Sequence, residues 1–315
     1  MDFELTADQE ALRDGIHKLL RGRAPMDRVR VAEQLPGAVD PSLWAELDAA
    51  GVFSLRLPED AGGTGLGMAD AVLVFEELGR SLVSGPLVAT LVCAGSVDGI
   101  VVAVERTGGP LVIEHLGAAD HLILLDEHGA WRVAVADVDA EPVPEPIDPL
   151  TPLHRLRSVP QGEQVAGEVI AARWRLEGAV LTAALLLGIA AATTEIAVAY
   201  AGDRHQFDRP IGSFQAIKHL LADMLVRAEV ARAAVYAAGV TLDDPCAGDP
   251  IRAAAVAKVQ AGQAAMANGK GCIQVHGGMG FTWDADAHLY LKRAWVLDTQ
   301  FGSASDHAEI LADFA

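Results

Sequence analysis

The opening residues of the chain carry the pattern of apolar and polar positions expected of helices. After Thr6-Ala7-Asp8-Gln9, a capping-box pattern, apolar residues recur three and four positions apart. Asp40-Pro41 offers a second N-cap followed by a first-turn proline, and residues 68–78 repeat the helical spacing. We therefore predict an N-terminal helical domain over residues 1–97.

The pattern changes near residue 99, where β-branched and apolar residues gather in short runs. Asp126-Glu127-His128-Gly129 has the composition of a hairpin connection, and the proline-rich residues 141–152 favour an edge or a loop. We expect strands at 100–104, 111–113, 122–125 and 131–135. A small, reduced β domain is thus predicted for residues 98–168.

Long helical patterns return after this region and continue to the end of the chain. Breaks at 208–212, 243–245 and 277–280 divide them into four or five helices. Consecutive long helices with short connections favour an antiparallel bundle, here over residues 169–315. The predicted fold class is mainly α with a small β domain.

Composition and charge favour some classes of protein function and exclude others. Hydrophobic residues make up 51% of the 315 and aromatic residues only 5%, which suits closely packed Ala- and Leu-rich helices. The formal charge of -19 opposes binding to nucleic acid or an anionic membrane. The uncharged stretch Gly178–Thr194 is shorter than a membrane span usually is, so we interpret it as a buried helix.

The N-terminal residues and the cysteines indicate where in the cell the protein is expected. Met1-Asp2-Phe3-Glu4 lacks the basic and apolar regions of a signal peptide. The three cysteines lie far apart without a CxxC pair, so neither a disulfide framework nor a metal site is indicated. A cytoplasmic location is the expectation.

The first stretch with candidate chemistry is Arg204–Gln215, which lies between two long helical patterns. Arg204 supplies a planar cation for phosphate or ribose oxygens, Gln206 and Gln215 supply amides, and Phe207 offers a stacking face. Such residues suit a nucleotide cofactor. A solvated turn with a packed aromatic residue is the alternative.

A second stretch, Gln274-Val275-His276-Gly277-Gly278-Met279-Gly280-Phe281, follows another helix. Its glycines permit positive φ and close approach of the backbone to a ligand. Taken alone, the stretch is more typical of a helix C-cap.

Together and in this order, the two stretches resemble the acyl-CoA dehydrogenase family, whose members carry R-x-Q-F-G-x-P-I-x-x-F-Q and later Q-x-x-G-G-x-G-F. Asp208 replaces the glycine of the first motif. Residues 57–67 and Phe75-Glu76-Glu77-Leu78-Gly79-Arg80 look like the family's first helical domain, so the resemblance covers most of the chain. It implies an acyl-CoA dehydrogenase-like fold and α,β-dehydrogenation of an acyl-CoA thioester with FAD.

The resemblance also implies which residues contact FAD. In such proteins the cofactor lies at a subunit interface, so oligomerisation is implied, with the second stretch acting across the boundary. The contacts carry over to Arg204, Gln206, Phe207, Ile211 and Gln215, and to Gln274, Val275, His276, Gly277 and Gly278.

The catalytic base of the family is missing from its usual place. Many members carry it in an E-G-T or E-G-S turn, and the matching residues here are Phe301-Gly302-Ser303. Other members place it on the long helix before the arginine motif, a position that falls on Gly178. Glu177, one residue earlier, is a weak alternative, and Asp298 is another carboxylate to consider.

The β region also departs from the family. The T-E-x-x-x-G-S-D and W-x-T-N stretches that embrace the flavin ring are not found between Thr90 and Gly167. The chain thus resembles the shortened, base-lacking subunit of bacterial heteromeric (α2β2) dehydrogenases, whose partner is a homologous full-length subunit. A self-sufficient homomeric dehydrogenase and a flavin-free scaffold remain alternatives.

Overall fold

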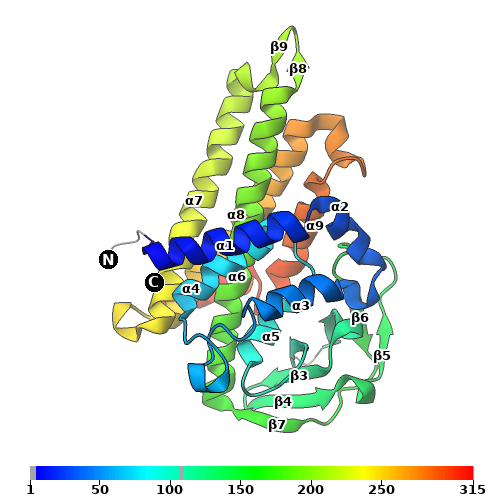
Figure 1. The fold of residues 1–315 in the computed structure, drawn as a ribbon, viewed down its shortest axis with the longest axis vertical. Coiled ribbons are helices and arrows are strands. Elements are labelled where there is room, and N and C mark those ends of the chain that lie inside the picture. The colour runs from blue at the N-terminus through cyan, green and yellow to red at the C-terminus, as the bar shows by residue number, and fades with distance from the viewer. Residues whose placement is uncertain (1–4, 107–108, 315) are drawn as a thin grey trace.

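The computed structural model describes residues 5–106 and 109–314, so the predicted absence of a signal peptide at Met1–Glu4 lies outside the described residues. Helices dominate both ends of the chain and strands lie between them (Figure 1). The N-terminal helices are α1 (Ala7–Arg23), α2 (Met26–Val31), α3 (Pro41–Ala49), α4 (Met68–Arg80) and α5 (Leu87–Cys93).

Local signals in the sequence explain where these helices begin. Thr6 caps α1 in a capping box with Gln9, as predicted. Asp40 caps α3 by accepting from the backbone N–H groups of Ser42 and Leu43, and Pro41 opens the helix. The glycine-rich residues 57–65 form the connection toward α4.

Two small sheets form the middle region, with strands β1 (Val101–Glu105), β2 (Val112–Glu114), β3 (His121–Asp126), β4 (Gly129–Ala134), β5 (Ala140–Pro142), β6 (Leu153–Leu156) and β7 (Glu163–Gly167). One sheet has the order β1-β3-β4-β7 and the other β2-β6-β5. The predicted hairpin joins β3 and β4 in antiparallel pairing, with Asp126 opposite Gly129. β1 pairs with β3 in parallel, and the proline-rich segment contributes the edge strand β5.

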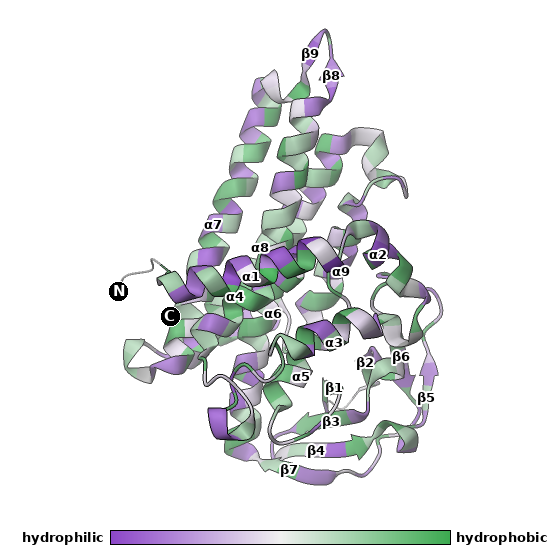
Figure 2. Ribbon diagram, in the orientation of Figure 1, coloured by the Kyte–Doolittle hydropathy of each residue, from purple (hydrophilic) through white to green (hydrophobic). Residues whose placement is uncertain are grey.

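The C-terminal region is built from α6 (Glu168–Asp203), α7 (Gln215–Asp243), α8 (Pro250–His276), α9 (Ala287–Thr299) and α10 (Ala304–Ala312). A short hairpin, β8 (His205–Gln206) and β9 (Arg209–Pro210), joins α6 to α7 and projects beyond the bundle as a hydrophilic tip (Figure 2). α6 has the length and apolar composition to cross a membrane, but 89% of its most apolar window is buried inside the protein. The stretch 178–194 is therefore a buried helix, as interpreted from its composition.

A shared hydrophobic core connects the three regions. One cluster of buried side chains runs from Ile16 in α1 through Phe75 in α4 and Ile123 in β3 to Leu186 in α6. The helical and β segments thus pack on a common core, with α6 at its centre.

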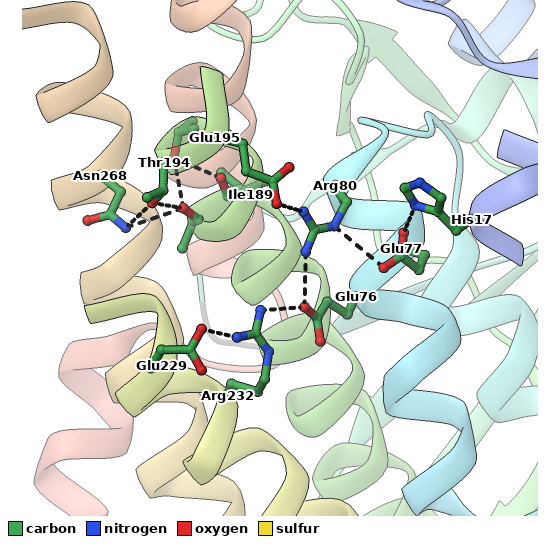
Figure 3. Close-up of polar contacts among 12 residues, drawn as sticks. His17, Glu76, Glu77, Arg80, Ile189, Thr194, Glu195, Glu229, Arg232 and Asn268 are labelled. Carbon is green, nitrogen blue, oxygen red and sulfur yellow. Dashed lines mark hydrogen bonds and ion pairs between the residues drawn. The ribbon is translucent and has the colours of Figure 1, made fainter. Parts of the chain in front are cut away.

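Polar residues of α4 join the helices around α6, as Figure 3 shows. Glu76 accepts hydrogen bonds from Arg232 (2.9 Å) and from the Tyr236 hydroxyl (2.8 Å), both on α7. Arg80 donates to Glu195 at 2.6 Å. His17 lies 2.8 Å from the Glu77 carboxylate. The acidic and basic side chains of this network are paired with one another. The Phe75–Arg80 segment therefore has a structural role, since it supplies Glu76, Glu77 and Arg80.

Candidate functional site

The turn between α9 and α10 places Phe301 in the left-handed region, with φ of 51°, and Gly302 follows with φ of 88°. Two buried side chains hold this turn. The Lys258 ammonium donates to the Asp298 carbonyl (2.8 Å) and the Gly302 carbonyl (2.7 Å). The His307 Nε2–H donates to the Phe301 carbonyl at 2.9 Å. The turn that carries the base in many family members is thus firmly built here, with an aromatic side chain in place of the carboxylate.

The ring of Phe301 lies against α6 at Gly178. A β-carbon built on this glycine would come within 2.4 Å of ring carbons Cδ1 and Cε1. Gly178 is the position at which other family members carry the base. The two alternative base positions therefore meet at one point, and neither carries a proton acceptor.

Glu177 lies beside this point but its carboxylate is engaged elsewhere. The side chain is buried, with 3% of its surface exposed. Arg56 binds both carboxylate oxygens, at 2.7 and 2.8 Å, and Arg173 donates to Oε1 at 2.7 Å. Glu177 does not line the cavity beside Phe301. This geometry fits an ion-paired structural residue better than a base.

Asp298, the other carboxylate considered from the sequence, points toward α8. A β-carbon on Gly262 would lie 2.6 Å from Asp298 Oδ1. Within the described part of the chain, this buried oxygen has no hydrogen-bond partner. Asp298 does not line the cavity beside Phe301 either.

A cavity of about 250 Å³ opens beside Phe301, between the α4–α5 connection, the strands β1 and β2, and helices α6 and α9. Glu114 at the end of β2 is part of its wall, and Gln300 donates a hydrogen bond to its carboxylate. Burial raises the pKa of Glu114 to about 7. Glu114 was not predicted from the sequence, because the alternation Leu111-Val112-Ile113-Glu114 assigns it to the outer face with the exposed Val112. No signal in the chain showed that the Gln300 turn covers that face.

The Arg204 stretch forms the hairpin at the far end of α6. Phe207 and Asp208 are its two turn residues, and both have positive φ, 54° and 63°. Two successive positive φ values are those of a type I′ turn, which favours glycine but accepts aspartate. Asp208 therefore preserves the hairpin although it replaces the glycine of the family motif.

The second stretch lies at the same end of the bundle as the hairpin. The His276 ring stacks on Tyr200 of α6, with ring centroids 4.0 Å apart. Val275 belongs to the same apolar cluster that Ile211 packs against. Gly277 ends α8 with φ of 60°, a conformation that glycine adopts without strain. The two stretches thus lie at the same end of one chain, whereas the resemblance implies that the second stretch acts across a subunit boundary.

Several side chains at this end are exposed and make few contacts with the described residues. Across residues 5–106 and 109–314, the Arg204 guanidinium makes no ion pair, and Arg209 instead lies over the Phe214 ring at 4.1 Å. Phe207 is 86% exposed, and Phe281 is 82% exposed. An arginine without an ion pair among these residues, exposed amides and largely exposed aromatic rings suit the phosphates and rings of a dinucleotide. The residues therefore fit the FAD that the resemblance implies.

The hairpin and the Phe301 turn lie far apart in one chain. Gly178 lies in the first third of α6 and Arg204 directly follows the helix, and a rise of 1.5 Å per residue separates them by about 40 Å along the helix axis. No side chain spans this distance. The two parts therefore cannot act on the same atoms within one chain.

Models of known protein families and known relatives match this chain. The model of the acyl-CoA dehydrogenase N-terminal domain matches residues 6–102, and that of the acyl-CoA dehydrogenase C-terminal domain matches residues 171–315. The acyl-CoA dehydrogenase IpdE2 of Mycolicibacterium smegmatis is 33% identical over 92% of this chain and 93% of its own length. The acyl-CoA dehydrogenase FadE34 of Mycobacterium tuberculosis is 37% identical over 92% of this chain, which spans only 45% of FadE34.

Solved structures share the fold along the whole chain. A variant of the Tcur3481-Tcur3483 steroid ACAD superposes with a TM-score of 0.85 at 25% identity, covering 97% of each chain. The ChsE4-ChsE5 complex from Mycobacterium tuberculosis gives a TM-score of 0.87 at 23% identity, covering 99% of this chain and 98% of the other. On the strength of these matches, the chain belongs to the acyl-CoA dehydrogenase family, oxidoreductases that act on a CH–CH bond of an acyl-CoA.

Proposed function

We propose that this chain is the base-lacking subunit of a heteromeric acyl-CoA dehydrogenase and completes the FAD site of a homologous full-length subunit. The observation that carries the proposal is the contact of Phe301 with Gly178. Removal of a proton next to a thioester carbonyl requires a positioned proton acceptor. Phe301 and Gly178 occupy the two positions at which family members carry that acceptor, and neither residue can take a proton.

Residues at the hairpin end would hold the cofactor. Arg204 would neutralise phosphate charge, Gln206 and Gln274 would hydrogen-bond to polar atoms, and Phe207 would stack on a ring. FAD, when bound, supplies the acceptor for the hydride that leaves the substrate. Because the hairpin lies about 40 Å along α6 from the chain's own Phe301 turn, we assign it to a site shared with the partner.

The relatives support an enzyme built from two different homologous subunits. The part of FadE34 beyond this chain is longer than the chain itself, since the match covers 45% of FadE34, and is long enough for a second subunit of this size. Two solved structures of the same fold are named as pairs, ChsE4-ChsE5 and Tcur3481-Tcur3483. These names, and not the present chain, suggest bulky acyl groups such as steroid derivatives as substrates.

Purification of the chain alone and together with its homologous full-length subunit tests the proposal. We expect the chain alone to show no acyl-CoA-dependent dye reduction, and the complex to show both flavin absorbance and dye reduction. Strong dye reduction by the chain alone would favour a homomeric enzyme with a base of its own. A complex that never binds flavin would favour a flavin-free scaffold.

A further inference from the structure

We propose that Tyr200 is a positioning residue, which holds the imidazole of His276 so that Nε2 accepts a hydrogen bond from a donor group of the cofactor. The donor groups that FAD offers are its sugar hydroxyls and the adenine amino group. Tyr200 lies outside both stretches with candidate chemistry, Arg204–Gln215 and Gln274–Phe281. This role rests on the proposed function, since it requires that the complex holds FAD.

Tyr200 joins the two stretches at the end of α6. The backbone N–H of Arg204 donates to the Tyr200 carbonyl at 2.9 Å, so Tyr200 lies one helical turn before the first stretch. Its ring stacks on His276 of the second stretch, with ring centroids 4.0 Å apart and an angle of 23° between the planes. The same side chain packs against the buried apolar cluster that contains Met224 and Val275. Tyr200 therefore supports the second stretch from the helix that ends at the first.

A hydrogen bond on one side of the His276 imidazole fixes its tautomer. Nδ1 lies 2.8 Å from the backbone carbonyl oxygen of Cys272, one turn earlier in α8. A carbonyl oxygen accepts and cannot donate, so Nδ1 carries the hydrogen. In the neutral ring, Nε2 is then left with a lone pair and acts as an acceptor.

The Nε2 atom of His276 is open to a ligand. Within residues 5–106 and 109–314 no group hydrogen-bonds to it, and it is not one of the buried atoms without a partner. The next residues, Gly277 and Gly278, are exposed, and a β-carbon on either would meet nothing within 4 Å. The space beside the acceptor is therefore free of described side chains.

The chemistry of an acceptor selects among the groups of the cofactor. The phosphate oxygens of a dinucleotide carry no hydrogen near neutral pH, so they cannot donate to Nε2 of His276. Hydroxyl and amino groups can donate. Stacking on Tyr200 fixes the plane of the ring and therefore the direction of the lone pair, whereas an aliphatic residue in place of Tyr200 would leave the ring free to tilt.

Flavin dissociation constants of the complex with the full-length subunit, measured by the fluorescence of released flavin on dilution, test the acceptor. His276→Phe keeps a ring for stacking but has no acceptor, so it should raise the Kd about fivefold, as loss of a neutral hydrogen bond of about 1 kcal/mol does. His276→Gln, whose Oε1 can accept, should stay within about twofold of wild type. Equal Kd values for wild type and His276→Phe would overturn the proposal.

Variants of Tyr200 test whether it acts through His276. Tyr200→Phe keeps the stacked ring and should bind flavin as wild type does. Tyr200→Leu should raise the Kd about threefold, within the range of an aromatic pair. Added to His276→Phe, the same change should have no further effect, because no acceptor remains to be positioned. An equal loss in both backgrounds would show a merely structural role and would overturn the proposal.

Salt and a cofactor analogue identify the group that His276 contacts. The ratio of the His276→Phe and wild-type Kd values should be equal in about 50 mM and about 500 mM NaCl, because a neutral hydrogen bond is not screened. A ratio that shrinks in high salt would indicate a charged ring against phosphate and would overturn the assignment.

Flavin hypoxanthine dinucleotide, in which a carbonyl replaces the adenine amino group, then separates the two donors. A ratio that persists with this analogue assigns a sugar hydroxyl, and a ratio near one assigns the amino group. The two proposals fail in different ways. A wild-type complex without flavin would overturn the proposed function and this role together, whereas a flavin-bound complex that is insensitive to Tyr200 and His276 would overturn this role alone.

Discussion

The aromatic ring of Phe301 packs directly on Gly178, where a β-carbon would meet ring carbons at 2.4 Å. The turn after α9 and the face of α6 at Gly178 are the two places where family members carry the catalytic base. Because these places touch, only one of them has room for a large side chain. In this chain the large side chain is a phenylalanine, and the place of the base is filled by an apolar ring.

Gly178→Ala should destabilise the protein by about 1–3 kcal/mol, because the added methyl group overpacks the Phe301 ring. Elsewhere in a helix the same change stabilises by up to about 1 kcal/mol. Gly202 on the same helix provides the control, since a β-carbon there meets nothing within 4 Å. Urea unfolding of both variants, and of Gly178→Ala combined with Phe301→Ala, measures the coupling. An equal cost of Gly178→Ala with and without the Phe301 ring would contradict the contact.

Glu177→Gln should reduce stability by about 3–5 kcal/mol, because it leaves the charges of Arg56 and Arg173 without their buried partner. Dye reduction by the folded complex should stay within about twofold of wild type, since proton abstraction by a positioned group contributes at least about a hundredfold. Thermal unfolding and steady-state kinetics on the same preparation separate the two effects. A folded variant with activity lowered a hundredfold or more would restore Glu177 as the base.

Asp208→Gly should keep the β8–β9 hairpin and its flavin retention, because glycine adopts the positive φ of 63° without strain. Asp208→Val should reduce flavin retention several-fold, since a β-branched residue is strained in that conformation. Flavin absorbance of the purified complex gives the readout. If the valine variant retained flavin as well as the glycine variant, the hairpin geometry would not matter for binding.

Lys258→Met should lower stability by about 1–3 kcal/mol, because buried carbonyls of the Phe301 turn lose their donor. Burial lowers the pKa of Lys258 to about 8, so above pH 8 the unfolded chain holds more protons at this lysine than the folded chain does. Wild-type stability therefore gains from this group as pH rises from 8 toward 10, and the methionine variant lacks that gain. Urea unfolding at pH 7 and 9.5 should show a stability gap that widens with pH. A constant gap would mean that Lys258 keeps its usual pKa.

Local signals in the sequence predicted much of the fold. The capping residues Thr6 and Asp40 mark the starts of α1 and α3, and the Asp126–Gly129 hairpin and the breaks near Asp208 and Gly277 also lie where predicted. These features depend on neighbouring residues, which is why the sequence shows them. The strands β6 and β7 were not predicted, because their polar residues carry no clear alternation.

Contacts between distant segments could not be predicted in this way. The sequence located Phe301 and Gly178 separately by counting along family motifs, but nothing in it showed that the two residues touch. Glu114 was missed for a similar reason, because the Gln300 turn that covers it comes from the other end of the chain. The FAD contacts, the domain boundaries and the cytoplasmic location remain predictions.

Flavin content of the purified heteromer tests the central claim most directly. Arg204→Ala removes an arginine that begins the hairpin, while Arg252→Ala removes an exposed arginine near the start of α8, at the other end of the bundle. The account predicts that Arg204→Ala lowers flavin per complex several-fold and that Arg252→Ala leaves it at the wild-type level. Equal flavin content in all three complexes would contradict the claim that this chain completes the flavin site.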